Sequence, residues 1–249
     1  MNYLIDKLNS LKPYGVVGIK QSFEDEGVIY DDVVTMRRIT EICSVPLYVK
    51  IGGCEAKSDI NNCIRLGVDS IIAPMVETEF SMKKYLGSVA EDTEIEMMFV
   101  CETKTAVENI QSILTVPGAD RLGGIVFGRS DFTKSLNLSK SEVDSEVVNS
   151  YIEKTLRIAK EHFLKTTMGG NISVRSTQFI QKLFMAKLLD KIETRNVVIG
   201  LNDSNINNLS QTIQTVLDFE MDWLRYKAKQ YSTIAEDCIY RAALLQNRK

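Results

Sequence analysis

The feature that most constrains the fold is a regular alternation of two kinds of segment. Short apolar runs rich in Val, Ile, Phe and Met recur along the chain, and each is followed by a longer segment of helical periodicity. Their centres are spaced by roughly 30 residues, the size of one strand-helix unit. Eight such runs are present, at residues 15–20, 47–51, 70–75, 95–101, 124–128, 165–169, 196–201 and 221–227.

The runs are continuous rather than alternating, which is typical of parallel strands buried on both faces. The segments between them place apolar residues on one helical face, as Val33, Met36 and Ile39 do. No Pro/Gly/Ser-rich linker or change of composition divides the chain. We therefore predict an α/β protein in which residues 1–249 form a single domain, a (β/α)8 TIM barrel. A doubly wound open sheet is the alternative, but its glycine-rich first turn is replaced here by QSFEDEG.

Charge and targeting signals exclude several classes of protein. Thirty basic residues face thirty-three acidic ones, for a formal net charge of −3, so nothing calls for a nucleic acid or a membrane surface as partner. The N-terminus has no apolar secretion signal, and no run is long enough to cross a bilayer. The five cysteines contain no CxxC pair, which suits a reducing compartment. We expect a cytoplasmic protein.

The sequence contains one histidine, His162, in the helix-patterned segment 147–163. A Ser/His/Asp triad, a three-histidine zinc site and an HExxH helix therefore lack the residues they need. Any chemistry must depend on carboxylates, lysines and backbone dipoles. In a TIM barrel these groups act at the C-terminal ends of the strands, and all eight ends are polar or glycine-rich, including residues 200–203 after the seventh run.

Two carboxylates follow neighbouring runs. Glu102 ends the run EIEMMFVCE, and Asp131 follows GGIVFGRSD one unit later. At the tips of adjacent parallel strands they could share Mg²⁺, which takes one or two carboxylates and fills its other positions with waters and substrate oxygens. The alternative is that each acid caps the helix that follows it.

Three lysines, Lys20, Lys50 and Lys227, each end a different run. A lysine at the barrel mouth can orient a substrate carboxylate, stabilise an enolate, or form a Schiff base with a carbonyl. Each could equally be a surface charge. The acidic turn that contains Glu24 and Glu26 is similarly open: it could supply a general base or hold a water on a metal, or be a solvated loop.

Small residues and free backbone N–H groups mark other strand ends. The segments GRSD and MGGN could receive a substrate carboxylate or phosphate, which makes Gly128, Arg129, Ser130 and Asn171 candidate substrate-binding residues. Neither segment is a Walker loop or a GxGxxG fingerprint, so nucleotide binding has little support.

Three segments follow one another between residues 67 and 138, namely GVDSIIAPMVET, FVCETKTAVENIQSILTVPGAD and GGIVFGRSDFTKSL. In these segments the chain resembles the HpcH/HpaI aldolase and citrate lyase β-subunit family. The resemblance implies a TIM barrel of the phosphoenolpyruvate/pyruvate-binding type. It also implies Mg²⁺, or Mn²⁺ or Co²⁺, bound by Glu102 and Asp131, with a 2-oxo acid such as pyruvate, or the carboxylate of a CoA thioester, chelated by the metal. Carbon–carbon cleavage then leaves an enolate that the metal and a nearby cation stabilise.

The chain departs from the family at three positions. The family's histidine in an acidic turn is replaced by FEDEG, its active-site arginine falls at Lys50, and Arg129 stands in GRSDF where the family has GPxDL. A lysine can neutralise an enolate but cannot grip it with two parallel hydrogen bonds. We expect Arg129 to add a cation near the metal, and the missing histidine's proton transfer to fall to a carboxylate, a lysine or water.

Four functions remain open. The first is a metal-dependent aldolase that joins or cleaves a 2-oxo acid and an aldehyde, with Lys50, Lys20, Glu24 and Glu26 as catalytic candidates. The others are a lysine Schiff-base aldolase, a CoA-thioester lyase of the citrate lyase β type, and a barrel without catalytic activity. The resemblance further implies a homo-oligomer, a trimer or hexamer, to which the helix-patterned segment 233–245 could contribute.

Overall fold

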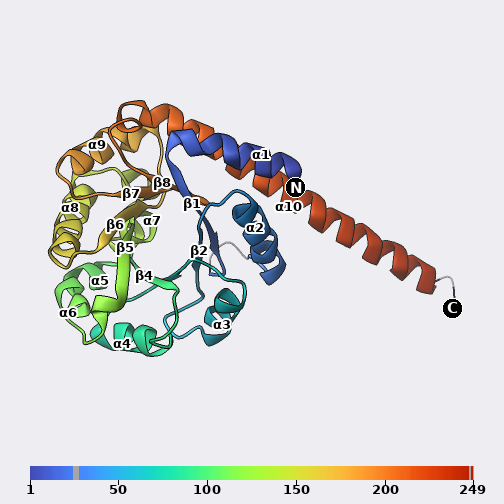
Figure 1. Cartoon of the computed structure of the whole chain (residues 1–249), viewed down its shortest axis with the longest axis horizontal. Coiled ribbons are helices and arrows are strands. Elements are labelled where there is room, and N and C mark those ends of the chain that lie inside the picture. Colours follow the sequence, from blue (N-terminus) through green and yellow to red (C-terminus); the bar gives the residue numbers. More distant parts are fainter. Residues whose placement is uncertain (25–27, 247, 249) are drawn as a thin grey trace.

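The structure, a computed structural model, describes residues 1–24, 28–246 and 248 and contains a closed barrel of eight strands (Figure 1). The strands follow one another around the barrel in chain order. They are β1 (Val16–Ser22), β2 (Leu47–Lys50), β3 (Ser70–Ala73), β4 (Glu96–Cys101), β5 (Leu122–Gly128), β6 (Lys165–Gly169), β7 (Lys191–Glu193) and β8 (Val197–Gly200). The predicted fold class, an α/β barrel of the TIM type, is confirmed.

Helices surround the barrel in Figure 1 and cover the outer faces of its strands. The α-helices are α1 (Asn2–Leu11), α2 (Tyr30–Ile42), α3 (Lys57–Arg65), α4 (Glu79–Gly87), α5 (Lys104–Glu108), α6 (Ile110–Leu114), α7 (Arg129–Ser135), α8 (Glu146–Glu161), α9 (Thr177–Met185) and α10 (Leu209–Gln246). Short 3-10 turns are η1 (Lys12–Tyr14), η2 (Ala119–Arg121), η3 (Lys140–Glu142), η4 (Val174–Ser176) and η5 (Ile206–Asn208). Among the described helices, none is long and apolar enough to cross a membrane.

One of the eight predicted runs is not a strand, and one strand was not predicted. Residues 221–227 lie inside α10, where Phe219 and Trp223 are buried at helical spacing, so the apolar residues there form a helix face rather than a strand. The seventh strand, β7, was missed because two of its three residues are charged. Its Lys191 and Glu193 bind partners on strands β2 and β1 across the barrel, so their charges are satisfied in the interior.

Strand β8 runs antiparallel to both of its neighbours, which corrects the all-parallel prediction. Ile199 pairs with Val16 of β1 and with Ile192 of β7 in antiparallel registers, whereas β1 to β7 are mutually parallel. Only residues 194–196 separate β7 from β8, too few for a crossover helix but enough for a hairpin. The hairpin therefore lies at the C-terminal end of the parallel strands, and residues 200–203 lie at the opposite end.

Alternate residues of the strands face two separate cores. Ile71 packs outward into the large cluster between strands and helices, while its neighbour Ile72 faces inward. The inward cluster fills the barrel and consists of Tyr48, Ile72, Met98, Val100, Val126 and Val198. Gly18 is required beside it, because a Cβ there would lie 2.3 Å from the Tyr48 ring. This packed interior forms a floor that closes the barrel below the strand ends.

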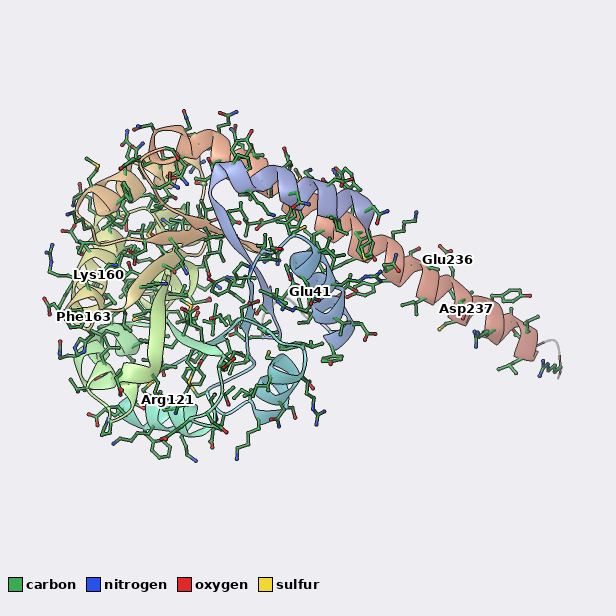
Figure 2. The ribbon with its side chains drawn as sticks, viewed as in Figure 1. Glu41, Arg121, Lys160, Phe163, Glu236 and Asp237 are labelled. Atoms are coloured by element: carbon green, nitrogen blue, oxygen red, sulfur yellow. The ribbon has the colours of Figure 1, made fainter. Side chains whose placement is uncertain are left out.

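Helix α10 has two different halves. Its first half packs on the barrel through residues such as Val216, Phe219 and Trp223. Its second half is exposed over residues 228–246 and projects away from the barrel in Figure 1. Glu236 and Asp237 lie on this projecting part in Figure 2, far from the barrel.

Candidate active site

A cavity of about 390 Å³ opens at the C-terminal end of the parallel strands. It is where seven of the residues singled out from the sequence come together: Lys20, Lys50, Glu102, Gly128, Ser130, Asp131 and Asn171. The same wall includes residues that sequence reasoning missed, namely Ser22, Lys140, Glu193, Thr194, Arg195 and Glu220.

Glu102 directly follows strand β4 and is only 2% exposed. Its Oε1 accepts a hydrogen bond from the Met75 backbone N–H at 3.1 Å, and its Oε2 lies 3.3 Å from Lys50 Nζ. Burial raises the pKa of the Glu102 carboxyl, and the Lys50 ammonium and the Met75 N–H oppose that rise. Gly128 has to be a glycine here, because a Cβ would lie 2.8 Å from the Glu102 Cβ.

Lys50, the last residue of β2, joins two carboxylates. Its Nζ is 2.6 Å from Glu24 Oε2 as well as 3.3 Å from Glu102 Oε2, and its side chain is 11% exposed. One ammonium group therefore faces a buried acid on one side and a more exposed acid on the other. The predicted candidate Glu26 lies outside the described residues.

Asp131 lies in the first turn of α7, with its Oδ1 2.8 Å from Lys134 Nζ. Neither Asp131 nor Glu102 caps a helix: the N-cap of α7 is Gly128, and that of α5 is Thr103, whose Oγ1 accepts from the Ala106 N–H. The capping alternative for these two acids is therefore wrong. Both carboxylates are instead directed to the cavity.

The donor set of the cavity suits a hard cation. Within the described part of the chain, no group of three or more His, Cys, Asp or Glu side chains is placed to hold a metal. Glu102 and Asp131 line the same cavity, and the donor atoms of their side chains are carboxylate oxygens. Mg²⁺ binds proteins through one or two carboxylates and keeps waters or substrate oxygens, whereas zinc sites take three or four protein ligands, mostly His and Cys. The residues present therefore fit Mg²⁺ and do not fit zinc.

A second ion pair lies deeper in the barrel. Lys20 Nζ is 2.5 Å from Glu193 Oε1, and both side chains line the cavity. Glu193 belongs to the missed strand β7, and the alternation Lys-Ile-Glu is the sequence signal that could have revealed it. Gly169 leaves room for it, because a Cβ there would lie 2.7 Å from Glu193 Cγ.

Glu220 of α10 holds the β7–β8 hairpin in place. Its Oε1 accepts from Thr194 Oγ1 at 2.6 Å and from the Asn196 N–H at 2.5 Å. Burial raises the pKa of this carboxyl, against the effect of those two hydrogen bonds. The long helix thus contributes a buried acid to the cavity wall.

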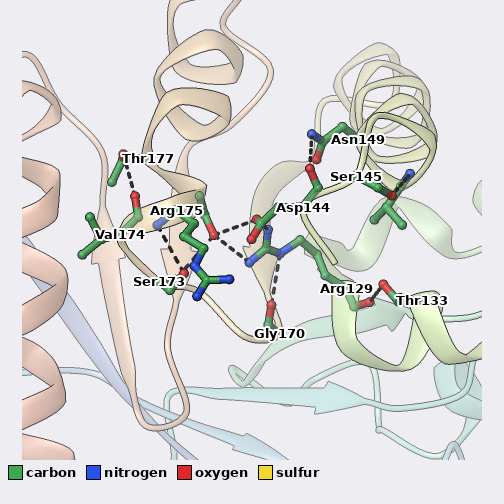
Figure 3. A network of polar contacts seen from close by, with 12 residues as sticks. Arg129, Thr133, Asp144, Ser145, Asn149, Gly170, Ser173, Val174, Arg175 and Thr177 are labelled. Atoms are coloured by element: carbon green, nitrogen blue, oxygen red, sulfur yellow. Dashed lines mark hydrogen bonds and ion pairs between the residues drawn. The ribbon is translucent and has the colours of Figure 1, made fainter. Parts of the chain in front are cut away.

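Arg129 does not supply the cation expected beside the metal. Its side chain is fully buried and is not among the residues that line the cavity. Figure 3 shows it between Asp144 and Gly170. Its guanidinium donates to Gly170 O (3.0 Å), Asp144 Oδ1 (2.7 Å) and Ser176 Oγ (3.1 Å). Arg129 therefore ties together the loops that follow β5 and β6, and the substrate-binding role predicted for it is not supported.

Lys227 was expected at the barrel mouth and lies elsewhere, because its segment is helical. Its Nζ is 3.0 Å from Asp32 Oδ2, which also accepts from the Tyr231 hydroxyl. It links α10 to α2 and is not part of the cavity wall. His162, at the C-terminal end of α8, faces Gln111 Nε2 at 3.1 Å and is likewise outside the cavity.

The model of the HpcH/HpaI aldolase/citrate lyase family matches residues 32–179, more than half of the chain and including Lys50, Glu102 and Asp131. The chain belongs to this family. The HpcH/HpaI aldolase/citrate lyase family is a family of carbon–carbon lyases, so the protein is an enzyme of the aldolase/citrate lyase type. Its members act on small-molecule substrates and generally depend on a divalent metal.

Solved structures share the fold at low sequence identity. An HpcH/HpaI aldolase from Desulfitobacterium hafniense has a TM-score of 0.63 at 14% identity, over 84% of this chain and 87% of its own. The citrate synthase SbnG has a TM-score of 0.63 at 16% identity, over 88% and 91%. A family member from Burkholderia cenocepacia has a TM-score of 0.62 at 14% identity, over 87% and 90%. No curated protein matches the chain in sequence.

Proposed function

We propose that this family member is a metal-dependent aldolase that uses a 2-oxo acid such as pyruvate and an aldehyde. The observation that carries the proposal is the arrangement of Glu102, Asp131 and Lys50 around one cavity at the C-terminal end of the barrel strands. Two carboxylates there offer oxygen ligands, and the adjacent ammonium offers a positive charge where an enolate would develop.

Glu102 and Asp131 would hold Mg²⁺, Mn²⁺ or Co²⁺. When bound, such an ion supplies Lewis-acid polarisation of the 2-oxo group. The remaining work falls to this chain's own residues. Lys50 Nζ stabilises negative charge beside Glu102, and the polar backbone of Gly128 and Ser130 with the side chain of Asn171 offers donors to the substrate carboxylate.

Glu24 is the proposed proton carrier. Glu24 is not among the residues that line the cavity, but its carboxylate lies 2.6 Å from the Nζ of Lys50, which does line it. A proton could therefore pass between substrate and the Lys50–Glu24 pair without an imidazole. His162 is too remote to take part, which removes the route that the family's histidine would provide.

Turnover should require a divalent cation. Incubating the full chain with pyruvate and a panel of aldehydes, with Mg²⁺ or Mn²⁺ present, should yield aldol products. EDTA should abolish their formation, because no metal ion then stabilises the negative charge that develops on the oxygen of the 2-oxo group. Product formation would be followed by mass spectrometry, and added Mg²⁺ should restore it. Turnover that EDTA leaves unchanged would contradict the metal mechanism.

A lysine Schiff-base aldolase is the second candidate, since Lys20 and Lys50 both line the cavity. Lys227 no longer belongs to this hypothesis, because it lies on α10 against Asp32. A CoA-thioester lyase has weaker support, because it would need free cations for the CoA phosphates. Among four basic residues in the family motifs or near them, Arg129 is buried, Lys134 pairs with Asp131, Lys83 with Glu79 and Lys84 with Glu55.

The five cysteines are free thiols, which supports the prediction of a cytoplasmic, reducing location.

We also propose a homo-oligomer, a trimer or hexamer, built through α10. Ile234, Ile239, Tyr240 and Leu245 are each at least 60% exposed on a helix that projects alone, an arrangement that isolated helices rarely maintain in water. Deleting residues 233–249 should convert the oligomer to a monomer in size-exclusion chromatography with light scattering. A full-length monomer, or an oligomer that survives the deletion, would contradict the proposal.

A further inference from the structure

An ion pair between Lys20 and Glu193 lies in the lower part of the active-site cavity. The register of β1 and β2 pairs Ser22 with Lys50 and Lys20 with Tyr48, so Lys20 enters the barrel one layer below Lys50. Both lysines line the same cavity. The cavity therefore contains a second ammonium group, on the neighbouring strand and closer to the barrel floor.

The Lys20–Glu193 pair is largely withdrawn from water. Its side chains are 13% and 7% exposed, and the same cavity is lined by apolar residues of the barrel floor, Ile72, Val100 and Val126. A buried ion pair adds little to stability, because the lost hydration of two charges offsets much of their attraction. Folding alone therefore does not account for this pair, whereas catalysis requires charged groups that are fixed in a site shielded from water.

Glu220 places a second acid near Lys20. Its carboxylate lines the cavity and accepts hydrogen bonds from Thr194 and Asn196 of the β7–β8 hairpin. Burial raises the pKa of Glu220, and the charge of the Lys20 ammonium is among the effects that oppose this rise. Lys20 thus has one acid in direct contact and another nearby, as Lys50 has two acids on the neighbouring strand.

The proposed aldol reaction requires two proton transfers at different atoms. The methyl group of pyruvate gives up a proton, for which the Lys50–Glu24 pair is proposed, and the aldehyde oxygen takes up a proton when the carbon–carbon bond forms. A positioned acid lowers the barrier of the second transfer, because the oxygen then never carries a full negative charge. The sequence has one histidine, His162, and it lies outside the cavity wall. The second transfer therefore needs a donor other than imidazole.

We propose that Lys20, held in place by Glu193, is the general acid that protonates the aldehyde oxygen, an inference that rests on the proposed aldolase function. As the enolate carbon attacks the aldehyde carbon, one electron pair of the C=O bond moves to the oxygen, which takes a proton from Lys20 Nζ. Lys20 is left as a neutral amine and regains a proton from solvent, while the Lys50–Glu24 pair releases the proton of pyruvate. One proton is released and one is taken up, so pyruvate and aldehyde give the aldol without another reactant.

Two measurements on the full chain with Mg²⁺ separate this step from the rest of the reaction. Exchange of the pyruvate methyl protons in D₂O, followed by ¹H NMR, requires removal of the methyl proton but no aldehyde. Aldol formation, with the aldehyde that the wild type turns over fastest, requires both transfers. Lys20→Met should lower kcat for aldol formation about 100-fold or more, as expected for the loss of a general acid. Its methyl exchange should stay within about twofold of wild type.

A double variant, Lys20→Gln with Glu193→Gln, guards against a folding defect, because it replaces the buried ion pair with two neutral amides. It should show the same slow aldol formation and normal exchange. Lys227→Gln with Asp32→Asn is the matched control: this ion pair is similarly buried, with side chains 11% and 9% exposed, but it joins α10 to α2 and is not part of the cavity wall. Both rates of the control should stay within about twofold of wild type.

Three results would overturn the inference alone. Lys20 variants could form aldol as fast as the wild type, they could lose methyl exchange and aldol formation to the same extent, or borohydride treatment with pyruvate could leave an adduct on Lys20. A wild type that forms no aldol with any aldehyde of the panel is a different result, because it overturns the proposed function, and the role of Lys20 falls with it.

Discussion

Glu102→Gln should abolish aldolase activity, lowering kcat/KM about 1,000-fold, a loss comparable to removing a main electrostatic stabiliser of a reacting oxyanion. Glutamine keeps the size of the side chain and can still accept from the Met75 N–H, so packing next to Gly128 is preserved. What disappears is the negative charge that faces the cavity and would hold the metal. Calorimetric titration with Mg²⁺ or Mn²⁺ should show the same loss without any turnover.

The same variant should reveal a conflict between activity and stability. The folded protein holds the proton of Glu102 more tightly than the unfolded chain does, because burial raises its pKa. Below the pKa that Glu102 has in the unfolded chain, its carboxyl therefore does not lower the free energy of unfolding. As pH rises through the pKa that Glu102 has in the folded protein, ionisation lowers that free energy. Without added metal, the Tm of Glu102→Gln minus the Tm of wild type should therefore be more positive at pH 8 than at pH 4.

Glu108→Gln is a suitable control, since this acid is exposed on α5 and lies 3.7 Å from Lys104 Nζ. Its kcat/KM should stay within about twofold of wild type, as for most surface changes. Substantial activity in Glu102→Gln, with metal affinity retained, would show that Glu102 is not the metal ligand.

The parts of the site that could be predicted from sequence are those in which local pattern and position agree. Glu102 and Asp131 follow long apolar runs that form strands β4 and β5, so their place at the C-terminal end of the barrel follows from the parallel topology. Lys20 and Lys50 reach the cavity for the same reason. In each case the strand itself is apolar enough to be recognised.

The errors have a common cause, which is that partners distant in the sequence decide the outcome. β7 carries two charges that only Lys20 and Tyr48, far away in the chain, make tolerable inside a barrel. Arg129 directly follows a strand, as a site residue would, yet its guanidinium is buried where it donates hydrogen bonds to Asp144 and Ser176. The direction of β8 follows from a three-residue connection that is visible only once β7 is known.

Lys50→Met should lower kcat/KM by about 100- to 1,000-fold, because the cation beside the developing negative charge is lost. It should also cost stability, by about 3–5 kcal/mol, since removing one partner of a buried ion pair leaves Glu102 without its counter-charge. Lys50 opposes the rise in the pKa of Glu102, so that pKa rises further in the variant. The loss of stability should therefore be larger at pH 8 than at pH 5, as urea titration at the two pH values would show.

Lys50→Arg separates the two ways in which this lysine could act. An arginine keeps the positive charge near Glu24 and Glu102, so electrostatic stabilisation predicts clear residual activity, whereas a Schiff base requires the primary amine and predicts none. Borohydride treatment with pyruvate gives an independent readout, because a Schiff base would be trapped as added mass on Lys50 or Lys20. Residual activity in Lys50→Arg, with no pyruvate adduct after borohydride treatment, would support the role of the ammonium as a charge stabiliser. An inactive arginine variant, together with a pyruvate adduct on Lys50 of the wild type, would instead support a Schiff-base mechanism on the lysine.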